Sequence, residues 1–226
     1  MPRRLLNVIK PACNTGMVDV KTENQDKLIG GSKGLAWLLI IGGIVGWAGA
    51  FALTLERLHV AANPDATLSC DIASFISCKS VMLSDQARLF GFPNPLIGLA
   101  AFFAPVVVGF AILARAKFAA WFWQLFALGN FLGFVFVLWL FDQAVFSIGA
   151  LCPYCMVSWT GMIPMFWAVF LHGTREGFIP VPLKMTNFFV AAYDWAWVFT
   201  VVTFLIFIVT IALKFWTLWE DLFRSL

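Results

Sequence analysis

Charged side chains are scarce in this sequence: Asp, Glu, Lys and Arg make up only 12% of its 226 residues, whereas hydrophobic residues make up 62%. A soluble domain contains about 25% charged and about 45–50% apolar residues. The net charge is only +3, which argues against a basic surface for nucleic acid. The composition therefore excludes an ordinary soluble core and indicates a protein that crosses a membrane several times.

The sequence contains several long runs of apolar residues. A membrane-spanning helix needs about 20 mostly apolar residues. Five segments meet this requirement: Leu35–Leu55, Leu96–Ala114, Trp121–Phe141, Tyr154–Leu171 and Trp195–Leu213. The first is too long, and has too long a polar stretch before it, for a signal peptide with its apolar core of about 7–15 residues. We predict an all-α, polytopic membrane protein.

The basic residues indicate how the chain crosses the membrane. Most of the 15 Lys and Arg residues fall on the side of the N-terminus, and basic loops stay in the cytoplasm. We predict a cytoplasmic polar tail (1–33), a transmembrane domain (34–216) and a short outer tail (217–226). The long outer loop, 56–95, is the segment expected to carry function, with a short amphipathic helix at the membrane surface over Ser80–Phe90.

The five cysteines divide unevenly between the two sides of this topology. Cys13 falls inside, where thiols stay reduced, whereas Cys70, Cys78, Cys152 and Cys155 all fall outside, where disulfides persist. Four cysteines on an oxidising face make two possible disulfides. This clustering is the strongest functional signal in the sequence.

The pair in LCPYCMVSW, residues 151–159, stands at the head of a predicted span. Pro153 suits a first helical turn, and both a helix N-terminus and a Cys-x-x-Cys spacing lower the pKa of a thiol. Disulfides exchange through mixed disulfides, so two pairs on one face suggest a relay. We expect Cys152 to exchange with the loop pair and Cys155 to face a quinone in the lipid. An external thiol is expected to reach the loop pair first.

Two other interpretations of the cysteines remain open at this point. Four clustered cysteines bind zinc in some proteins, but zinc motifs usually space paired ligands C-x₂₋₄-C, unlike Cys70 and Cys78. In the second interpretation, the disulfides only stabilise the structure of a membrane scaffold that has no enzymatic activity. A glutaredoxin-type site needs a strand–helix context, which a membrane-spanning helix excludes.

The stretches CDIASFISC, SVMLS, FPNPLIG and CPYC, taken together, resemble the bacterial branch of the vitamin K epoxide reductase family over about residues 35–215. The resemblance implies a four-helix bundle around a quinone, with a fifth transmembrane helix, in the plasma (inner) membrane. It implies an enzyme that reoxidises a DsbA-like, thioredoxin-like disulfide donor and reduces a quinone of the menaquinone or ubiquinone type, without a metal.

The resemblance also assigns roles to single residues. By position, Cys70 and Cys78 match the loop pair, and Cys152 and Cys155 match the active-site pair, with Cys155 at the quinone. Ser84 matches a residue that promotes thiolate reactivity, although it is otherwise only a polar residue of a surface helix.

Asn94 matches a residue that hydrogen-bonds a quinone carbonyl, although before Pro95 it also suits a cap or turn. Asp71 either tunes the neighbouring thiol or caps a turn.

Two features depart from the family pattern. Only Phe215–Leu226 follow the last span, so we expect no fused thioredoxin-like domain and a separate DsbA-like partner. Trp159 stands where vertebrate members carry a Tyr near the ring, which favours plain quinone reduction over epoxide reduction. Among polar residues in the spans, we expect Gln124 and Asn130 to bond between helices and His172 to have no catalytic role.

Overall fold

The computed structural model describes residues 28–65, 67–73, 75–179, 188–189 and 191–216. Cys13, most of the predicted tail 1–33 and the predicted tail 217–226 lie outside these residues. The described part of the chain is almost entirely helical, so the all-α prediction is confirmed.

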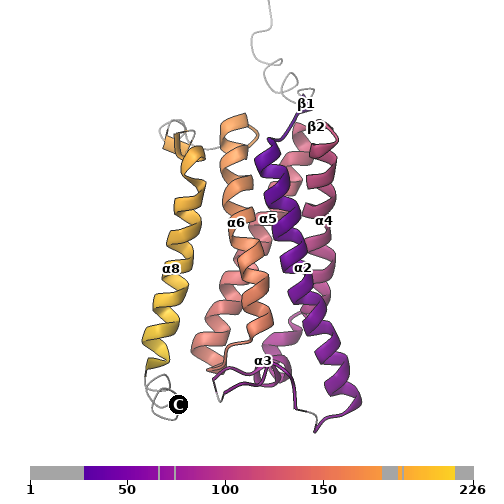
Figure 1. Ribbon diagram of the computed structural model, residues 1–226, viewed down its shortest axis with the longest axis vertical. Helices are drawn as coiled ribbons and strands as arrows, with labels where there is room; N and C mark the ends of the chain where they lie inside the picture. Colours follow the sequence, from indigo (N-terminus) through magenta and orange to yellow (C-terminus); the bar gives the residue numbers. More distant parts are fainter. Residues whose placement is uncertain (1–27, 66, 74, 180–187, 190, 217–226) are drawn as a thin grey trace, which may run out of the picture.

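Five helices are long and apolar enough to cross a membrane. They are α2 (Lys33–Ala62), α4 (Pro95–Leu113), α5 (Ala120–Asp142), α6 (Pro153–Glu176) and α8 (Ala196–Lys214). Each contains one of the five predicted spans or coincides closely with it. The bundle of four helices with a fifth beside it, α8, is visible in Figure 1.

Helix ends follow local sequence signals. The Ser32 hydroxyl caps α2 by accepting a hydrogen bond from the Leu35 backbone N–H at 3.1 Å. Pro95 and Pro153 stand in the first turns of α4 and α6, where a missing N–H leaves no bond unmade. Gly177, with φ of 80°, ends α6 in the left-handed conformation that favours glycine.

Helix α2 is the central element, because it packs against both α4 and α6. Its contact with α6 is close enough to require glycine. A Cβ built on Gly161 of α6 would lie 2.3 Å from the Gly42 carbonyl oxygen of α2. Small residues let membrane helices approach this closely, so glycine sets the distance between these two helices.

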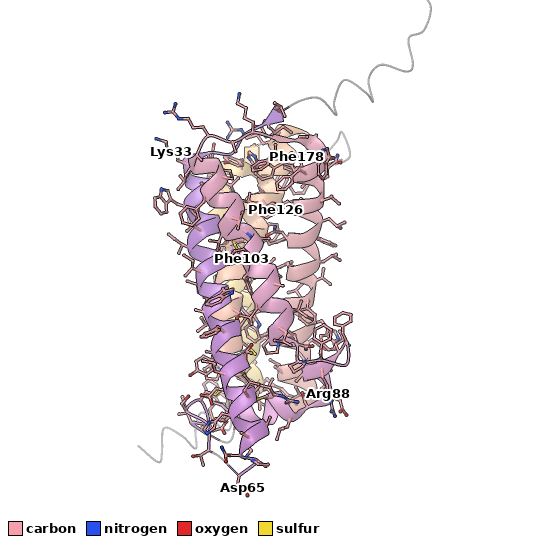
Figure 2. The ribbon with its side chains drawn as sticks, turned by 90° about the vertical axis from the view of Figure 1, so that its right-hand side faces the viewer. Lys33, Asp65, Arg88, Phe103, Phe126 and Phe178 are labelled. Carbon is pink, nitrogen blue, oxygen red and sulfur yellow. A yellow bond between two sulfur atoms is a disulfide. The ribbon has the colours of Figure 1, made fainter. Side chains whose placement is uncertain are left out.

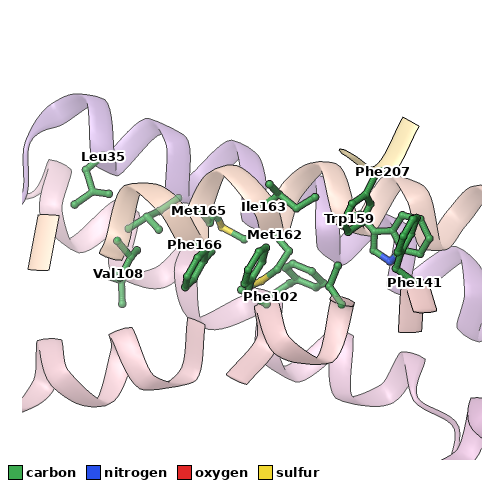
Figure 3. Packing of buried hydrophobic residues seen from close by; sticks show 14 of the residues in the cluster. Leu35, Phe102, Val108, Phe141, Trp159, Met162, Ile163, Met165, Phe166 and Phe207 are labelled. Carbon is green, nitrogen blue, oxygen red and sulfur yellow. The ribbon is translucent and has the colours of Figure 1, made fainter. Parts of the chain in front are cut away.

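Aromatic rings fill much of the remaining space. Phe134 of α5 stacks on Phe166 of α6 with centroids 4.1 Å apart, and Phe141 of α5 stacks on Phe207 of α8 at 3.9 Å. Figure 3 shows Phe166, Phe141 and Phe207 within this core. Ring stacking supplements area burial by about 0.5–1.5 kcal/mol per pair, and the second pair joins α8 to the bundle.

One end of the bundle is closed by backbone pairing. Strand β1 (Leu28–Ile29) pairs antiparallel with β2 (Phe118–Ala119), with Leu28 opposite Ala119. The Trp123 indole N–H donates to the Ile29 carbonyl at 3.0 Å. This end of the bundle, called the strand end below, therefore holds the segment before α2 against the link between α4 and α5.

The other end carries the loop that joins α2 to α4. Helix α2 continues past the predicted span end at Leu55 to Ala62, so the first part of the predicted loop 56–95 is helical. The predicted Ser80–Phe90 helix is observed as α3 (Cys78–Leu83) followed by the 3-10 helix η1 (Asp85–Arg88). They are separate because the backbone of Ser84, with φ −66° and ψ 155°, is extended. In Figure 1, α3 lies across this end.

Candidate functional site

Four cysteines meet at the end that carries α3, called the cysteine end below. Cys70 and Cys78 form a disulfide within the loop, while Cys152 and Cys155 are free thiols. The Cys152 Sγ lies 3.3 Å from the Cys78 Sγ. The sulfur of one pair is therefore in contact with the sulfur of the other.

Backbone hydrogen bonds hold Cys78 and Cys152 in register. The Leu151 N–H donates to the Phe75 carbonyl at 2.8 Å, and the Ser77 N–H donates to the Leu151 carbonyl at 3.0 Å. Ser77 and Leu151 each directly precede one of the two cysteines. This short bridge between the loop and the segment before α6 thus fixes which loop sulfur faces the helix pair.

Asp71 holds the start of α3. Its Oδ1 accepts hydrogen bonds from the Ser77 hydroxyl at 2.8 Å and from the Lys79 backbone N–H at 3.1 Å. Partial burial acts to raise the pKa of this carboxyl, but these hydrogen bonds outweigh it and lower the pKa. Of the two readings of Asp71 left open by the sequence, the capping contact is observed.

The Cys152 thiol has an environment that favours the thiolate. Its pKa is lowered mainly because the Cys155 thiol hydrogen-bonds to it, against the effect of burial, with help from the Cys155 and Tyr154 backbone N–H groups. The Asp71 carboxylate opposes this shift through its negative charge. The lowered pKa agrees with the prediction made from the helix N-terminus.

The sulfur atoms are enclosed. Cys70 is 3% exposed, Cys78 0% and Cys152 1%. The apolar residues packed around them are Leu53, Val60, Leu68 and Met82. The expectation that an external thiol reaches the loop pair directly is therefore wrong for this conformation, because the disulfide is buried among apolar residues of α2, the loop and α3.

Polar contacts fasten the loop over the site. The Ser69 hydroxyl donates to the Glu56 carboxylate at 2.6 Å and lies 3.1 Å from the Tyr154 hydroxyl. The Lys79 ammonium donates to the Pro64 carbonyl at 2.8 Å. Since Ser69 directly precedes Cys70 and Tyr154 lies within the CPYC motif, the contact between Ser69 and Tyr154 connects the two cysteine segments a second time.

A cavity of about 830 Å³ begins at the cysteines and extends between α2, α4, α5 and α6. Cys78, Cys152, Cys155 and Asn94 line it at the cysteine end, and Trp121 lines it at the far side. Most of its other walls are apolar side chains and glycines. The cavity thus has polar groups at the cysteine end and apolar walls beyond them. This shape fits a flat ring that carries oxygens and an apolar tail.

Asn94 and Ser84 both lie beside the cysteines, but their polar groups already have protein partners. The Asn94 amide donates to the Gln86 carbonyl at 2.7 Å and accepts from the Leu89 N–H at 3.1 Å. The Ser84 hydroxyl donates to the Val81 carbonyl at 2.7 Å, and Ser84 lines a small hollow with Cys152 and Cys155. Asn94 retains one N–H that these bonds do not use.

The predicted packing residues have different partners. The Gln124 side chain donates to the Phe178 carbonyl at 3.1 Å, so it bonds outside its own helix, but to the segment that follows α6 and not to a second helix. The expectation for Asn130 is wrong, because its amide bonds the Phe126 carbonyl of the same helix at 2.9 Å, and it lines the cavity. His172 is buried at the strand end against Trp123, away from the cysteines.

Sequence reasoning missed Arg57, whose side chain lines the cavity beside the cysteines. The sequence predicts a loop over residues 56–95, so it gave no reason to place Arg57 on a helix at the site. Among the described residues, no group of three or more His, Cys, Asp and Glu side chains is placed to hold a metal ion.

Comparison with known proteins identifies a family. The model of the Vitamin K epoxide reductase family matches residues 37–170, which is more than half of the chain and includes all four clustered cysteines. A comparison with curated proteins gave no match.

Proposed function

The chain belongs to the vitamin K epoxide reductase family, and we propose that it is a membrane thiol–quinone oxidoreductase. Membership indicates a membrane thiol–disulfide oxidoreductase. In the finer proposal, it reoxidises a DsbA-like partner outside the cytoplasm of a plasma (inner) membrane and passes the electrons to a quinone. The observation that carries this proposal is the 3.3 Å contact between the sulfurs of Cys78 and Cys152.

The contact supports an internal exchange between the two pairs. The Cys78 thiolate attacks the Cys152 Sγ of a Cys152–Cys155 disulfide, so a Cys78–Cys152 bond forms and Cys155 leaves as a thiolate. The Cys70 thiolate then attacks Cys78, and Cys152 is released. Two electrons pass from the loop pair to the helix pair, and the two protons lost by the loop thiols balance those taken up. The observed loop disulfide with free Cys152 and Cys155 matches the product.

The same geometry favours Cys70 as the sulfur that meets the partner. Cys78 faces Cys152, so an attack by a partner thiolate on Cys70 leaves Cys78 free to continue the relay. Because Cys70 is buried, the loop has to open for this step. The bonds that Ser69 makes to Glu56 and Tyr154 are those that opening breaks.

The residues of the cavity fit a quinone of the menaquinone or ubiquinone type. The Asn94 amide has a free N–H for a ring oxygen, Cys155 lies at the cavity wall, and apolar walls suit the ring and its tail. A bound quinone would supply an acceptor for two electrons and two protons. Cys155 and Cys152 give up their protons as their disulfide re-forms, and Ser84 lies beside both thiols.

Two rival functions are distinguished by experiment. A scaffold with structural disulfides has no use for free thiols that touch a disulfide. Epoxide reduction differs only in the acceptor; here Trp159 is packed against Phe141 and Phe207 with centroids 5.6 and 5.7 Å away. Its indole offers an N–H but no hydroxyl to a substrate, which favours plain quinone reduction.

The first test is turnover with a variant of the terminal thiol. Purified protein, a reduced DsbA-like protein and menaquinone should give quinone reduction measured by absorbance. Cys155→Ala should lower the rate by about 10²-fold or more, because the dithiol that reduces the acceptor is gone. Cys13→Ala is the matched control and should keep the rate. A full rate in Cys155→Ala contradicts the mechanism, and no quinone-dependent thiol change in the parent protein favours the scaffold.

The second test asks which loop sulfur meets the partner. Cys78→Ala leaves Cys70 unpaired, so it should trap the oxidised partner as a mixed disulfide visible on a non-reducing gel. Cys70→Ala should give little of this adduct, because Cys78 faces Cys152 and closes a bond within the chain. An adduct formed only by Cys70→Ala would reverse the assignment.

A further inference from the structure

Arg57 occupies an unusual place for a permanently charged side chain. It lies in the last two turns of α2, is only partly exposed, and lines the cavity together with Cys78 and Met82. Its guanidinium donates a hydrogen bond to the Met82 carbonyl at the end of α3. A cation is favoured at a helix C-terminus, so this bond by itself explains part of its position.

The bond to Met82 accounts for only one N–H donor of the guanidinium. Arg has five N–H donors, and among the described residues no carboxylate lies within ion-pair distance of Arg57. The neighbouring Glu56 carboxylate instead accepts the Ser69 hydroxyl and lies 3.9 Å from His59. The remaining donors of Arg57 thus have no anion in the described part of the chain.

Arg57 is also the sole charged residue among the described residues that line the cavity. Ionisable groups inside a membrane domain are costly and usually have a functional partner. Cys155 and Asn94, the groups proposed to meet the ring, line the same cavity. The cavity therefore has a permanent positive charge at the cysteine end and apolar walls beyond it.

We propose that Arg57 forms a cationic subsite for a ring oxygen, so that the cavity binds an anionic quinone more tightly than a neutral one of the same size. This inference rests on the proposed function. Charge-assisted hydrogen bonds are about twice as strong as neutral ones. The same contact strengthens as negative charge builds on a ring oxygen during reduction, which makes Arg57 favour electron transfer as well as binding.

The test compares two probes with one ring system. Lawsone, a hydroxynaphthoquinone, is an anion at neutral pH, whereas menadione is a neutral methylnaphthoquinone. Binding is followed by quenching of tryptophan fluorescence, since Trp121 and Trp159 line the cavity. We expect the parent protein to prefer lawsone at neutral pH and to lose this preference at acidic pH, where lawsone is protonated.

The variants separate charge from the structural bond. Arg57→Gln keeps a donor for the Met82 carbonyl but removes the charge, and should weaken lawsone binding by about 10- to 100-fold while changing menadione binding by less than about threefold. Arg57→Lys keeps the charge and should keep most of the preference. Arg88→Gln is the control, because Arg88 is at the same end but is 56% exposed and paired with Asp85.

Each outcome decides between the two proposals. Equal binding of the two probes by the parent protein, or an unchanged preference in Arg57→Gln, overturns the subsite and leaves quinone reduction standing. An equal loss of preference in Arg88→Gln also overturns it, because the effect would then come from net charge. If the parent protein binds neither probe, the quinone acceptor itself is wrong.

Discussion

Cys152 combines two properties that rarely occur together in a buried thiol. It is almost completely enclosed, which disfavours a thiolate, yet hydrogen bonds from the Cys155 thiol and two backbone N–H groups lower its pKa. A sulfur whose thiolate is stabilised in this way leaves readily when Cys70 attacks the Cys78–Cys152 bond, and its burial shields it from reagents in solution. The site therefore favours internal exchange over random oxidation.

The pH dependence of this thiol follows from its main hydrogen bond. A lowered pKa means that the Cys152 thiolate forms at a lower pH than an ordinary cysteine, and loss of the Cys155 donor should move the inflection to higher pH. We expect this upward shift in Cys155→Ala but little of it in Cys155→Ser, where a hydroxyl still donates. Thiolate ultraviolet absorbance, titrated in a Cys13→Ala background with the loop disulfide intact, measures it. An identical inflection in both variants contradicts the role of the bond.

At this scale the sequence singled out the four cysteines that the structure brings together, but not the contacts between them. The position of the CPYC motif at a helix head, with Pro153 in the first turn, was enough to predict a reactive pair. That Cys78, and not Cys70, faces Cys152 depends on the bridge between Ser77 and Leu151. Such a bridge joins distant segments over two residues and has no periodic pattern from which to predict it.

Among the elements, α2 determines where the site forms. Its contacts with α4 and α6 fix two walls of the cavity, and its last turns contribute Arg57 to the cavity and Glu56 to the contact with Ser69. Hydropathy ends the predicted span at Leu55 because polar residues follow. Helix α2 nevertheless continues to Ala62, so its polar face turns toward the site. A prediction from apolar runs misses residues of this kind, since they belong to a helix but not to its apolar part.

The close contact of α2 with α6 gives a prediction about stability. Gly161→Ala places a methyl group 2.3 Å from the Gly42 carbonyl oxygen, so the helices have to separate, at a cost of about 1–3 kcal/mol. Gly129→Ala in α5 meets no atom within 4 Å and should leave stability unchanged or raise it by up to about 1 kcal/mol. Thermal unfolding of the two variants in detergent compares them. Equal melting temperatures would show that α2 and α6 can move apart without loss of stability.

For the whole molecule, the two ends of the bundle have different constructions. The cysteine end is a loop folded over a reactive site, whereas the strand end is closed by β1, β2 and the Trp123 bond to Ile29. Basic residues near the strand end led to the prediction that it faces the cytoplasm. Relay chemistry with a DsbA-like partner requires the same orientation, because disulfides persist on the outer side.

The orientation is tested with single cysteines at the two ends, in a Cys13→Ser background. Asp65 and Lys33 are exposed and lie at opposite ends of the bundle, as Figure 2 shows. In intact cells, a membrane-impermeant maleimide should label Asp65→Cys, and it should label Lys33→Cys only after permeabilisation. The background protein without either substitution gives the labelling of the native cysteines. Labelling of Lys33→Cys alone in intact cells would place the cysteine end in the cytoplasm, where a reducing thiol pool would oppose disulfide formation and the proposed direction of electron flow would not hold.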